Sequence, residues 1–223
     1  MDAQYGERPF RDRADAGRRL AERLSAYRYG NPIVLALPRG GVPVGYEIAR
    51  ALDAPLDVFV ARKLGAPGQP ELGIGAVAQG GTRILNQRLV EHLGISDDYL
   101  ERITRREEKE VKRRLNLLRG GRPELEVRGR AVILVDDGLA TGVTARAAIE
   151  SLRERHPRQL ILAIPVCAAQ TARWIQPEVD AFVSLEIPSD LYAIGFWYEN
   201  FEQVSDREVM KLLDRAWRGR KDS

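Results

Sequence analysis

The run Ala131-Val-Ile-Leu-Val-Asp-Asp-Gly-Leu-Ala-Thr-Gly-Val-Thr-Ala145 constrains the fold more than any other part of the sequence. Its first five residues are apolar and mostly β-branched, which is typical of a strand buried on both faces. Asp136 and Asp137 follow this strand, 138–142 turns the chain, and 143–155 has the pattern of a helix. This arrangement predicts an anion site, because free backbone N–H groups and the helix dipole point at the ligand.

The residues within this run narrow the ligand to a phosphorylated ribose. Thr141 and Thr144 can add hydroxyl donors to a phosphate held by the amides of the turn. Asp136 and Asp137 would repel a polyphosphate, so we expect them to meet hydroxyl groups or a hard cation such as Mg²⁺. The run has neither the Gly-Lys-Ser/Thr of a Walker loop nor a Gly-x-Gly-x-x-Gly dinucleotide turn. The competing interpretation is a buried strand followed by a capped helix.

Strand and helix patterns alternate along most of the chain. The expected strands cover 33–37, 57–61, 131–135, 160–166 and 180–185, and the expected helices cover 11–27, 44–52, 96–119, 143–155, 168–175 and 207–217. This alternation predicts an α/β fold with a doubly wound, mainly parallel sheet, whose ligands bind at the carboxyl ends of strands. Pro38-Arg39-Gly40-Gly41 follows one such strand and is a second candidate anion site, although a Gly-Gly turn is often only a turn.

A segment rich in glycine and proline, 64–75, follows the two cations Arg62 and Lys63. Long loops of this composition are often lids, and adjacent cations at the root of a lid would suit a pyrophosphate leaving group. The alternative is a surface loop with solvated charges. Beyond the loop, 76–79 and 83–86 have the pattern of a hairpin.

The segment 86–128 is expected to form a helical insertion. Ser96 is a helix N-cap and Gly120 a helix stop, so a long helix is predicted between them. Its apolar stripe is narrow and is broken by Glu107, so one face packs while the rest meets solvent or a partner subunit. The run Arg105-Arg-Glu-Glu-Lys-Glu110 is interpreted as a solvated face of paired charges, without a role in nucleic-acid binding.

Composition limits the class of protein and its compartment. The chain of 223 residues suits a single domain, 1–223, with an elaboration. The net charge of +3 is too small to indicate a nucleic-acid partner. Cys167 is the only cysteine, which favours a reducing compartment, and no apolar stretch is long enough to span a bilayer. We therefore expect a cytoplasmic protein without a membrane partner, and the oligomeric state stays open, a homodimer included.

Three segments resemble parts of one known family, the type I phosphoribosyltransferases. In 131–144 the resemblance lies in the apolar residues, the two acids and Thr-Gly-x-Thr, and Arg39-Gly40-Gly41 resembles the pyrophosphate loop. The stretch 180–199 is similar to the hood of the hypoxanthine–guanine enzymes, which would extend here over 180–204. The resemblance implies Mg²⁺-dependent transfer of ribose 5-phosphate from 5-phosphoribosyl-1-pyrophosphate (PRPP) to a nitrogenous acceptor, with a nucleobase of the salvage pathways as the expected acceptor.

The resemblance also implies a role for each matching residue. Asp136 and Asp137 would be catalytic and would bind Mg²⁺ together with Glu199, and Arg62 and Lys63 would be catalytic cations at the leaving pyrophosphate. The residues expected to bind substrate are Arg39, Gly40, Gly41, Ala140, Thr141, Gly142, Val143, Thr144, Tyr192 and Ala193. Among them, Tyr192 would stack on the acceptor base and Ala193 would contact its edge through the backbone.

The acceptor half of the resemblance is incomplete. Ala140 stands where the hypoxanthine-type enzymes carry an acid, and the strand 160–167 lacks their lysine. The acceptor is therefore left unassigned, and core packing is the favoured interpretation of the hood aromatics Phe196 and Phe201. Two other functions stay open: a non-catalytic sensor of nucleotides or PRPP on the same fold, and a hydrolase or phosphorylase acting on a nucleotide.

Overall fold

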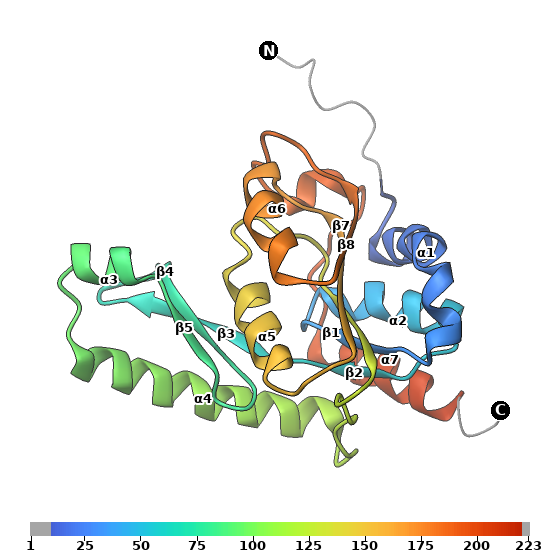
Figure 1. Ribbon diagram of the computed structural model, residues 1–223, viewed down its shortest axis with the longest axis horizontal. Coiled ribbons are helices and arrows are strands. Elements are labelled where there is room, and N and C mark those ends of the chain that lie inside the picture. Colours follow the sequence, from blue (N-terminus) through green and yellow to red (C-terminus); the bar gives the residue numbers. More distant parts are fainter. Residues whose placement is uncertain (1–9, 220–223) are drawn as a thin grey trace.

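A five-stranded parallel sheet forms the centre of the structure, a computed structural model that describes residues 10–219 (Figure 1). Its strands are β1 (Ile33–Ala36), β2 (Leu56–Val58), β6 (Ala131–Val135), β7 (Gln159–Val166) and β8 (Ala181–Glu186). They are arranged in the order β2-β1-β6-β7-β8, and every neighbouring pair is parallel. The predicted doubly wound α/β fold is confirmed.

Helices cover both faces of this sheet (Figure 1). The helices are α1 (Arg13–Arg23), α2 (Gly41–Leu52) and α7 (Asp206–Arg218) on one face, and α5 (Val143–Arg153) and α6 (Ala169–Ile175) on the other. Successive strand residues point to opposite faces: Val34 packs with the first group and Ile33 with the second. Both faces are therefore buried, which is why β1 and β6 are apolar throughout.

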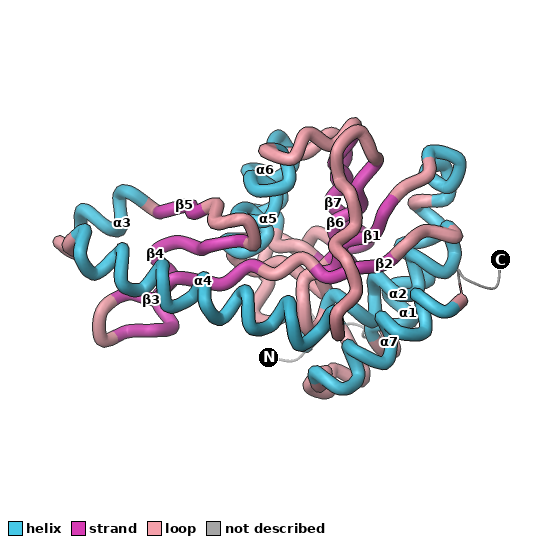
Figure 2. Tube along the Cα trace, turned by 90° about the horizontal axis from the view of Figure 1, so that it is seen from below, coloured by secondary structure: helices cyan, strands magenta, loops and turns pink. Residues whose placement is uncertain are grey.

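A second, antiparallel sheet and two helices extend to one side of the parallel sheet, and we call residues 61–120 the arm (Figures 1 and 2). The arm contains β3 (Ala61–Ala66), β4 (Gln69–Ala78), β5 (Arg83–Leu85), α3 (Gln87–His92) and α4 (Asp97–Arg119). The predicted caps of α4 are confirmed: Oγ of Ser96 accepts from the backbone N–H of Tyr99, and Gly120 is left-handed at φ 56°. Leu64 of β3, Ile74 of β4 and Ile103 of α4 belong to one hydrophobic core of the arm. The long helix therefore packs against β3 and β4.

The expectation that 64–75 is a loop was wrong, because these residues form most of a β-hairpin. The strands β3 and β4 pair in antiparallel register, with irregularities on both sides of Gly65. Leu64 and Ile74 are fully buried, and the hydroxyl of Tyr99 on α4 donates to the carbonyl of Gly65 over 2.9 Å. Glycine and proline hid the alternation that normally indicates a strand. The strand β2 of the parallel sheet ends at Val58, so Arg62 and Lys63 lie within β3 of the arm and not at the end of a strand of the parallel sheet.

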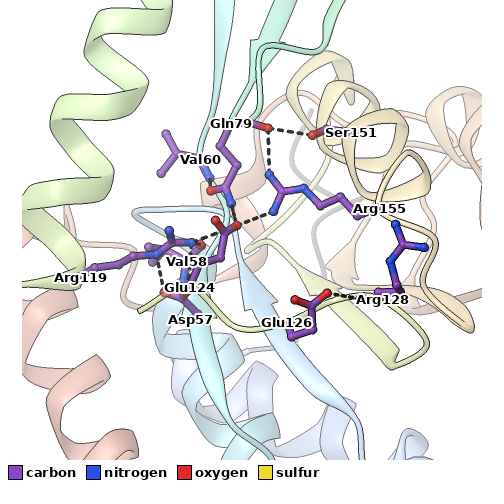
Figure 3. Close-up of polar contacts among 10 residues, drawn as sticks. All are labelled: Asp57, Val58, Val60, Gln79, Arg119, Glu124, Glu126, Arg128, Ser151 and Arg155. Carbon is purple, nitrogen blue, oxygen red and sulfur yellow. Dashed lines mark hydrogen bonds and ion pairs between the residues drawn. The ribbon is translucent and has the colours of Figure 1, made fainter. Parts of the chain in front are cut away.

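A cluster of polar side chains joins the arm to the parallel sheet (Figure 3). Arg119, the last residue of α4, lies 3.0 Å from Oδ2 of Asp57 in β2 and 3.6 Å from Glu124. Gln79, directly after β4, donates from Nε2 to Glu124 over 2.6 Å, and Arg155 beyond α5 forms an ion pair with Glu124. Glu124 therefore links the ends of α4, β4 and α5. We call the set Asp57, Gln79, Arg119, Glu124 and Arg155 the arm junction.

The C-terminal part of the expected hood crosses the carboxyl end of the sheet. After β8 the chain forms a 3₁₀ helix, Ile194–Trp197, and returns to α7. Tyr198 is fully buried between Phe10 and Phe201. Two further 3₁₀ helices cover Ser25–Gly30 and Gln176–Glu178. No helix within residues 10–219 is both long and apolar enough to cross a bilayer.

Candidate functional site

Asp136 and Asp137 stand at the carboxyl end of β6. The backbone N–H of Asp137 donates to Oδ1 of Asp136 over 2.9 Å. Burial of its carboxyl group raises the pKa of Asp136 well above the usual range, and the charge of the neighbouring Asp137 raises it further. A ligand that brings a cation or hydroxyl donors would favour the ionised form of Asp136.

The turn after β1 lies directly against this acid pair. The strands β1 and β6 are neighbours, so the segments that follow them leave the sheet at the same edge. A Cβ atom added to Gly40 would lie 1.9 Å from Oδ2 of Asp137, and one added to Gly41 would lie 2.7 Å from the carbonyl oxygen of Val135. Only glycine fits at these two positions. The structure therefore brings the Gly40-Gly41 turn against the acid pair that precedes the turn 138–142, so the two predicted anion sites are adjacent.

The turn between β6 and α5 presents backbone donors. Gly142 adopts the left-handed conformation at φ 65°, and α5 begins at the next residue. Within residues 10–219, no group accepts a hydrogen bond from the amides of Ala140, Thr141 and Gly142. Unpaired amides at the N-terminus of a helix are the donors that bind phosphate in many proteins.

Arg13 and Tyr198 belong to the site, and the sequence-based prediction missed both. Arg13 in α1 donates from Nε to Oδ2 of Asp137 over 2.7 Å and from a terminal nitrogen to the carbonyl of Glu202 over 2.8 Å. Its guanidinium lies 3.8 Å from the centre of the Phe201 ring. The hydroxyl of Tyr198 donates to the carbonyl of Asp137 over 2.6 Å. Asp137 is therefore fixed at its carboxylate and at its backbone.

One signal in the sequence pointed to Arg13. It lies three, seven and eleven residues before Ala16, Leu20 and Leu24, which are all fully buried. An arginine at this position is on the packed face of the helix, where a charged group requires a partner. The sequence does not identify that partner, because Asp137 is 124 residues away.

Arg39 does not join the acid pair. One terminal nitrogen of Arg39 lies 4.0 Å from Oδ1 of Asp206, in the first turn of α7. The peptide between Pro38 and Arg39 is cis. The role of Arg39 in substrate binding stays a prediction.

The cations Arg62 and Lys63 line a polar cavity of about 540 Å³ between the two turns and the arm. Pro38 borders this cavity from the turn after β1, and Thr144 borders it from the first turn of α5. Lys63 donates from Nζ to the carbonyl of Glu71 over 2.8 Å. The structure therefore brings both predicted cations to the same cavity as Thr144.

The three acids predicted to hold metal are not gathered into one cluster. Within residues 10–219, no group of three or more histidine, cysteine, aspartate and glutamate side chains is placed to hold a metal ion. Glu199 is exposed, and its backbone N–H donates to the carbonyl of Phe10 over 2.8 Å. Asp136 and Asp137 would therefore need oxygen ligands from substrate or water to complete the coordination of a cation.

The hood exposes two aromatic rings at its surface. Tyr192 is 78% exposed and Ala193 is also exposed, so both are accessible to a planar ligand. Phe196 is 52% exposed, so core packing was the wrong interpretation for it. Phe201 does pack, with its ring centre 4.9 Å from that of Tyr198.

Comparisons with known proteins identify relatives of this chain. Residues 10–200 match the family model described as the phosphoribosyl transferase domain. A Mycobacterium tuberculosis protein, whose name assigns it provisionally to the phosphoribosyl transferases, is 43% identical over 209 residues. That match covers 94% of this chain and 47% of the relative, so the chain spans about half the length of the relative. The crystal structure of TT1426 from Thermus thermophilus is 40% identical, with a TM-score of 0.79 over 92% of this chain and 97% of that one.

Proposed function

The chain belongs to the phosphoribosyl transferase domain family, and from this premise we propose that it transfers the ribose 5-phosphate of PRPP to a nitrogenous acceptor and releases pyrophosphate. One observation carries the proposal: the turn after β1 lies so close to the acid pair that a Cβ atom on Gly40 would clash with Asp137, and one on Gly41 with the backbone of Val135 and Asp136. A backbone turn that approaches two carboxylates this closely can bind a pyrophosphate while the carboxylates hold the hydroxyls of the attached ribose.

Each part of the site has a task in this reaction. The bond from C1′ of the ribose to pyrophosphate breaks as the acceptor nitrogen attacks C1′, and positive charge develops on the ribose ring. Asp136 and Asp137 would hold the ribose hydroxyls and stabilise that charge. The amides of 140–143, with the hydroxyls of Thr141 and Thr144, would hold the 5′-phosphate. Arg62 and Lys63 would stabilise the negative charge on the departing pyrophosphate.

The acid pair also fits a magnesium ion. Mg²⁺ in phosphate-binding enzymes is commonly held by one or two carboxylates together with phosphate oxygens and waters, so it does not require a cluster of protein ligands. Asp136 and Asp137 would supply those carboxylates, and the ion would neutralise charge on the pyrophosphate. Glu199, which lies outside any such cluster among residues 10–219, is proposed only as a contact to the acceptor.

The proposed acceptor is a planar nitrogenous base that stacks on Tyr192 and meets the backbone of Ala193. Because Ala140 supplies no acid and 160–167 contains no lysine, we expect hypoxanthine and guanine to be poor acceptors. The test is a screen of nucleobases and small amines with Mg²⁺ and PRPP, with pyrophosphate release as the readout. Release with at least one acceptor supports the proposal.

The same screen separates the two alternative functions. A protein that binds PRPP and releases no pyrophosphate with any acceptor would be a non-catalytic sensor. Release of pyrophosphate with water alone would indicate a hydrolase. An RNA-binding regulator is disfavoured, because Arg105 and Arg113 on α4 are each paired with a glutamate.

A further inference from the structure

Glu107 is a buried acid on the packed face of α4. Its side chain is 5% exposed, and Ile103 and Val111, one turn away on either side, belong to the core of the arm. Burial of a carboxylate costs several kcal/mol unless the charge is paired. Glu107, which breaks the apolar stripe seen in the sequence, therefore needs cationic partners that compensate its charge.

Two arginines share this one carboxylate. Oε2 of Glu107 accepts from Nε of Arg62 over 2.8 Å, and Oε1 accepts from Nε of Arg106 over 2.9 Å. Because Arg62 uses Nε for this contact, its two terminal nitrogens remain for another ligand, and neither donates to any residue between 10 and 219. Glu107 thus fixes the orientation of one cation from β3 and of another from its own helix.

Both arginines face the cavity that already contains Lys63. The α4 side of this cavity is lined by Tyr99, Ile103, Arg106, Glu107 and Arg114. The lining has four cations, Arg62, Lys63, Arg106 and Arg114, and two acids, Glu71 and Glu107. Lys63 pairs with Glu71 and Arg114 with Glu110, whereas Arg62 and Arg106 share the single carboxylate of Glu107. The excess positive charge opens toward Pro38 and Thr144, which border the two turns of the proposed PRPP site.

We propose that α4 is one wall of the leaving-group site: Arg106 and Arg114 bind the pyrophosphate end of the substrate, and Glu107 is a positioning residue that holds Arg62 and Arg106 toward it. The inference rests on the proposed function for the identity of the ligand. It gives the helical insertion a task, since a chain without α4 would lack both arginines and the acid that orients Arg62.

The test is calorimetric binding of inorganic pyrophosphate, with Mg²⁺, to wild type and to Arg106→Ala. Arg106 is 70% exposed, so its removal leaves the core of the arm intact. A charge-assisted hydrogen bond is worth about 1.5–3 kcal/mol, so we expect about 10-fold to 150-fold weaker binding. The matched control is Arg105→Ala, a neighbour that is 75% exposed, pairs with Glu101 and does not line the cavity. It should bind pyrophosphate as wild type does.

Glu107→Gln separates positioning from simple electrostatics. The substitution removes a negative charge beside the cavity, so electrostatics alone predicts tighter pyrophosphate binding. The amide group of glutamine would also meet one of the two guanidiniums with a donor in place of an acceptor. If Glu107 positions the arginines, binding of pyrophosphate weakens by at least about threefold despite the gain in positive charge. Unchanged or tighter binding would overturn the positioning role.

The outcomes distinguish this inference from the proposed function. Equal binding of pyrophosphate by wild type and Arg106→Ala, with normal turnover of PRPP, would overturn the inference and leave the function standing. Binding that depends on Arg106 without turnover of PRPP by any acceptor would support the anion site and overturn the function. Binding of neither pyrophosphate nor PRPP by wild type would overturn both.

Discussion

Arg13 donates from Nε to Oδ2 of Asp137 over 2.7 Å, and both side chains are almost fully shielded from solvent. The same guanidinium stacks on Phe201 and donates to the carbonyl of Glu202. The N-terminal helix, the acid pair and the hood therefore meet at one arginine. Through this contact a change in the hood can reach the carboxylate that is proposed to stabilise the reacting ribose.

Arg13→Ala should destabilise the fold. Removal of one partner of a buried ion pair leaves the other charge uncompensated and typically costs about 3–5 kcal/mol. Urea denaturation of wild type, Arg13→Ala, Asp137→Asn and the double variant measures this cost. The double variant should be more stable than Arg13→Ala alone, because it has no unpaired carboxylate. Strict additivity of the two single substitutions would show that Arg13 and Asp137 are not coupled.

Asp136→Asn should stabilise the unliganded protein while it reduces turnover. The raised pKa means that the folded state holds a proton more tightly than the unfolded state does. Stability from this group is therefore complete below the unfolded pKa, and it is lost as pH rises from about 4 through the raised folded pKa. Asparagine carries no charge, so urea denaturation at neutral pH should show a higher midpoint for the variant. A lower midpoint would contradict the conclusion that burial and the charge of Asp137 destabilise the ionised form of Asp136.

Arg119→Met should weaken the arm junction, by an amount that depends on pH. Burial raises the pKa of Asp57, and the neighbouring Arg119 opposes this rise. Without Arg119 the ionised form of Asp57 keeps the hydrogen bond from the backbone N–H of Val58 but loses its counter-charge, at a cost of roughly 3–5 kcal/mol. Because protonation removes that cost, the loss of stability should be larger at about pH 8 than at about pH 5. Denaturation of wild type and variant at both pH values is the measurement, and an equal loss at both would count against this pairing.

Tyr192→Ala should weaken binding of the acceptor and leave binding of PRPP nearly unchanged. Stacking of a base on an aromatic side chain is worth about 1–3 kcal/mol, so the acceptor KM should rise by about 5-fold to 150-fold. Steady-state kinetics with both substrates varied provides the measurement. An acceptor KM unaffected by the substitution would show that the hood does not place Tyr192 at the base.

Local signals in the sequence predicted the parallel sheet and the ends of α4. The apolar run 131–135, the cap Ser96 and the stop Gly120 each depend on a few neighbouring residues, which is why they could be recognised without a structure. The hairpin of β3 and β4 was misread because glycine and proline obscured its alternation.

The contacts that complete the site join residues distant in the chain. The break in the α4 stripe at Glu107 was visible, but its partner Arg62 is 45 residues away. Gly40 and Gly41 were recognisable as a turn, whereas their contact with the acid pair follows from the adjacency of β1 and β6 in the sheet. Pairings of this kind depend on topology, which single-residue patterns do not encode.

The most direct test of the central claim is pyrophosphate release from PRPP by wild type and by the double variant Asp136→Asn with Asp137→Asn. The assay uses Mg²⁺ and the best acceptor from the screen, with circular dichroism to show that the variant is folded. We expect release by wild type and a loss of about 100-fold or more in the variant, because the charges that stabilise the reacting ribose are gone. Near-normal release by a folded double variant would contradict the assignment of this acid pair to phosphoribosyl transfer.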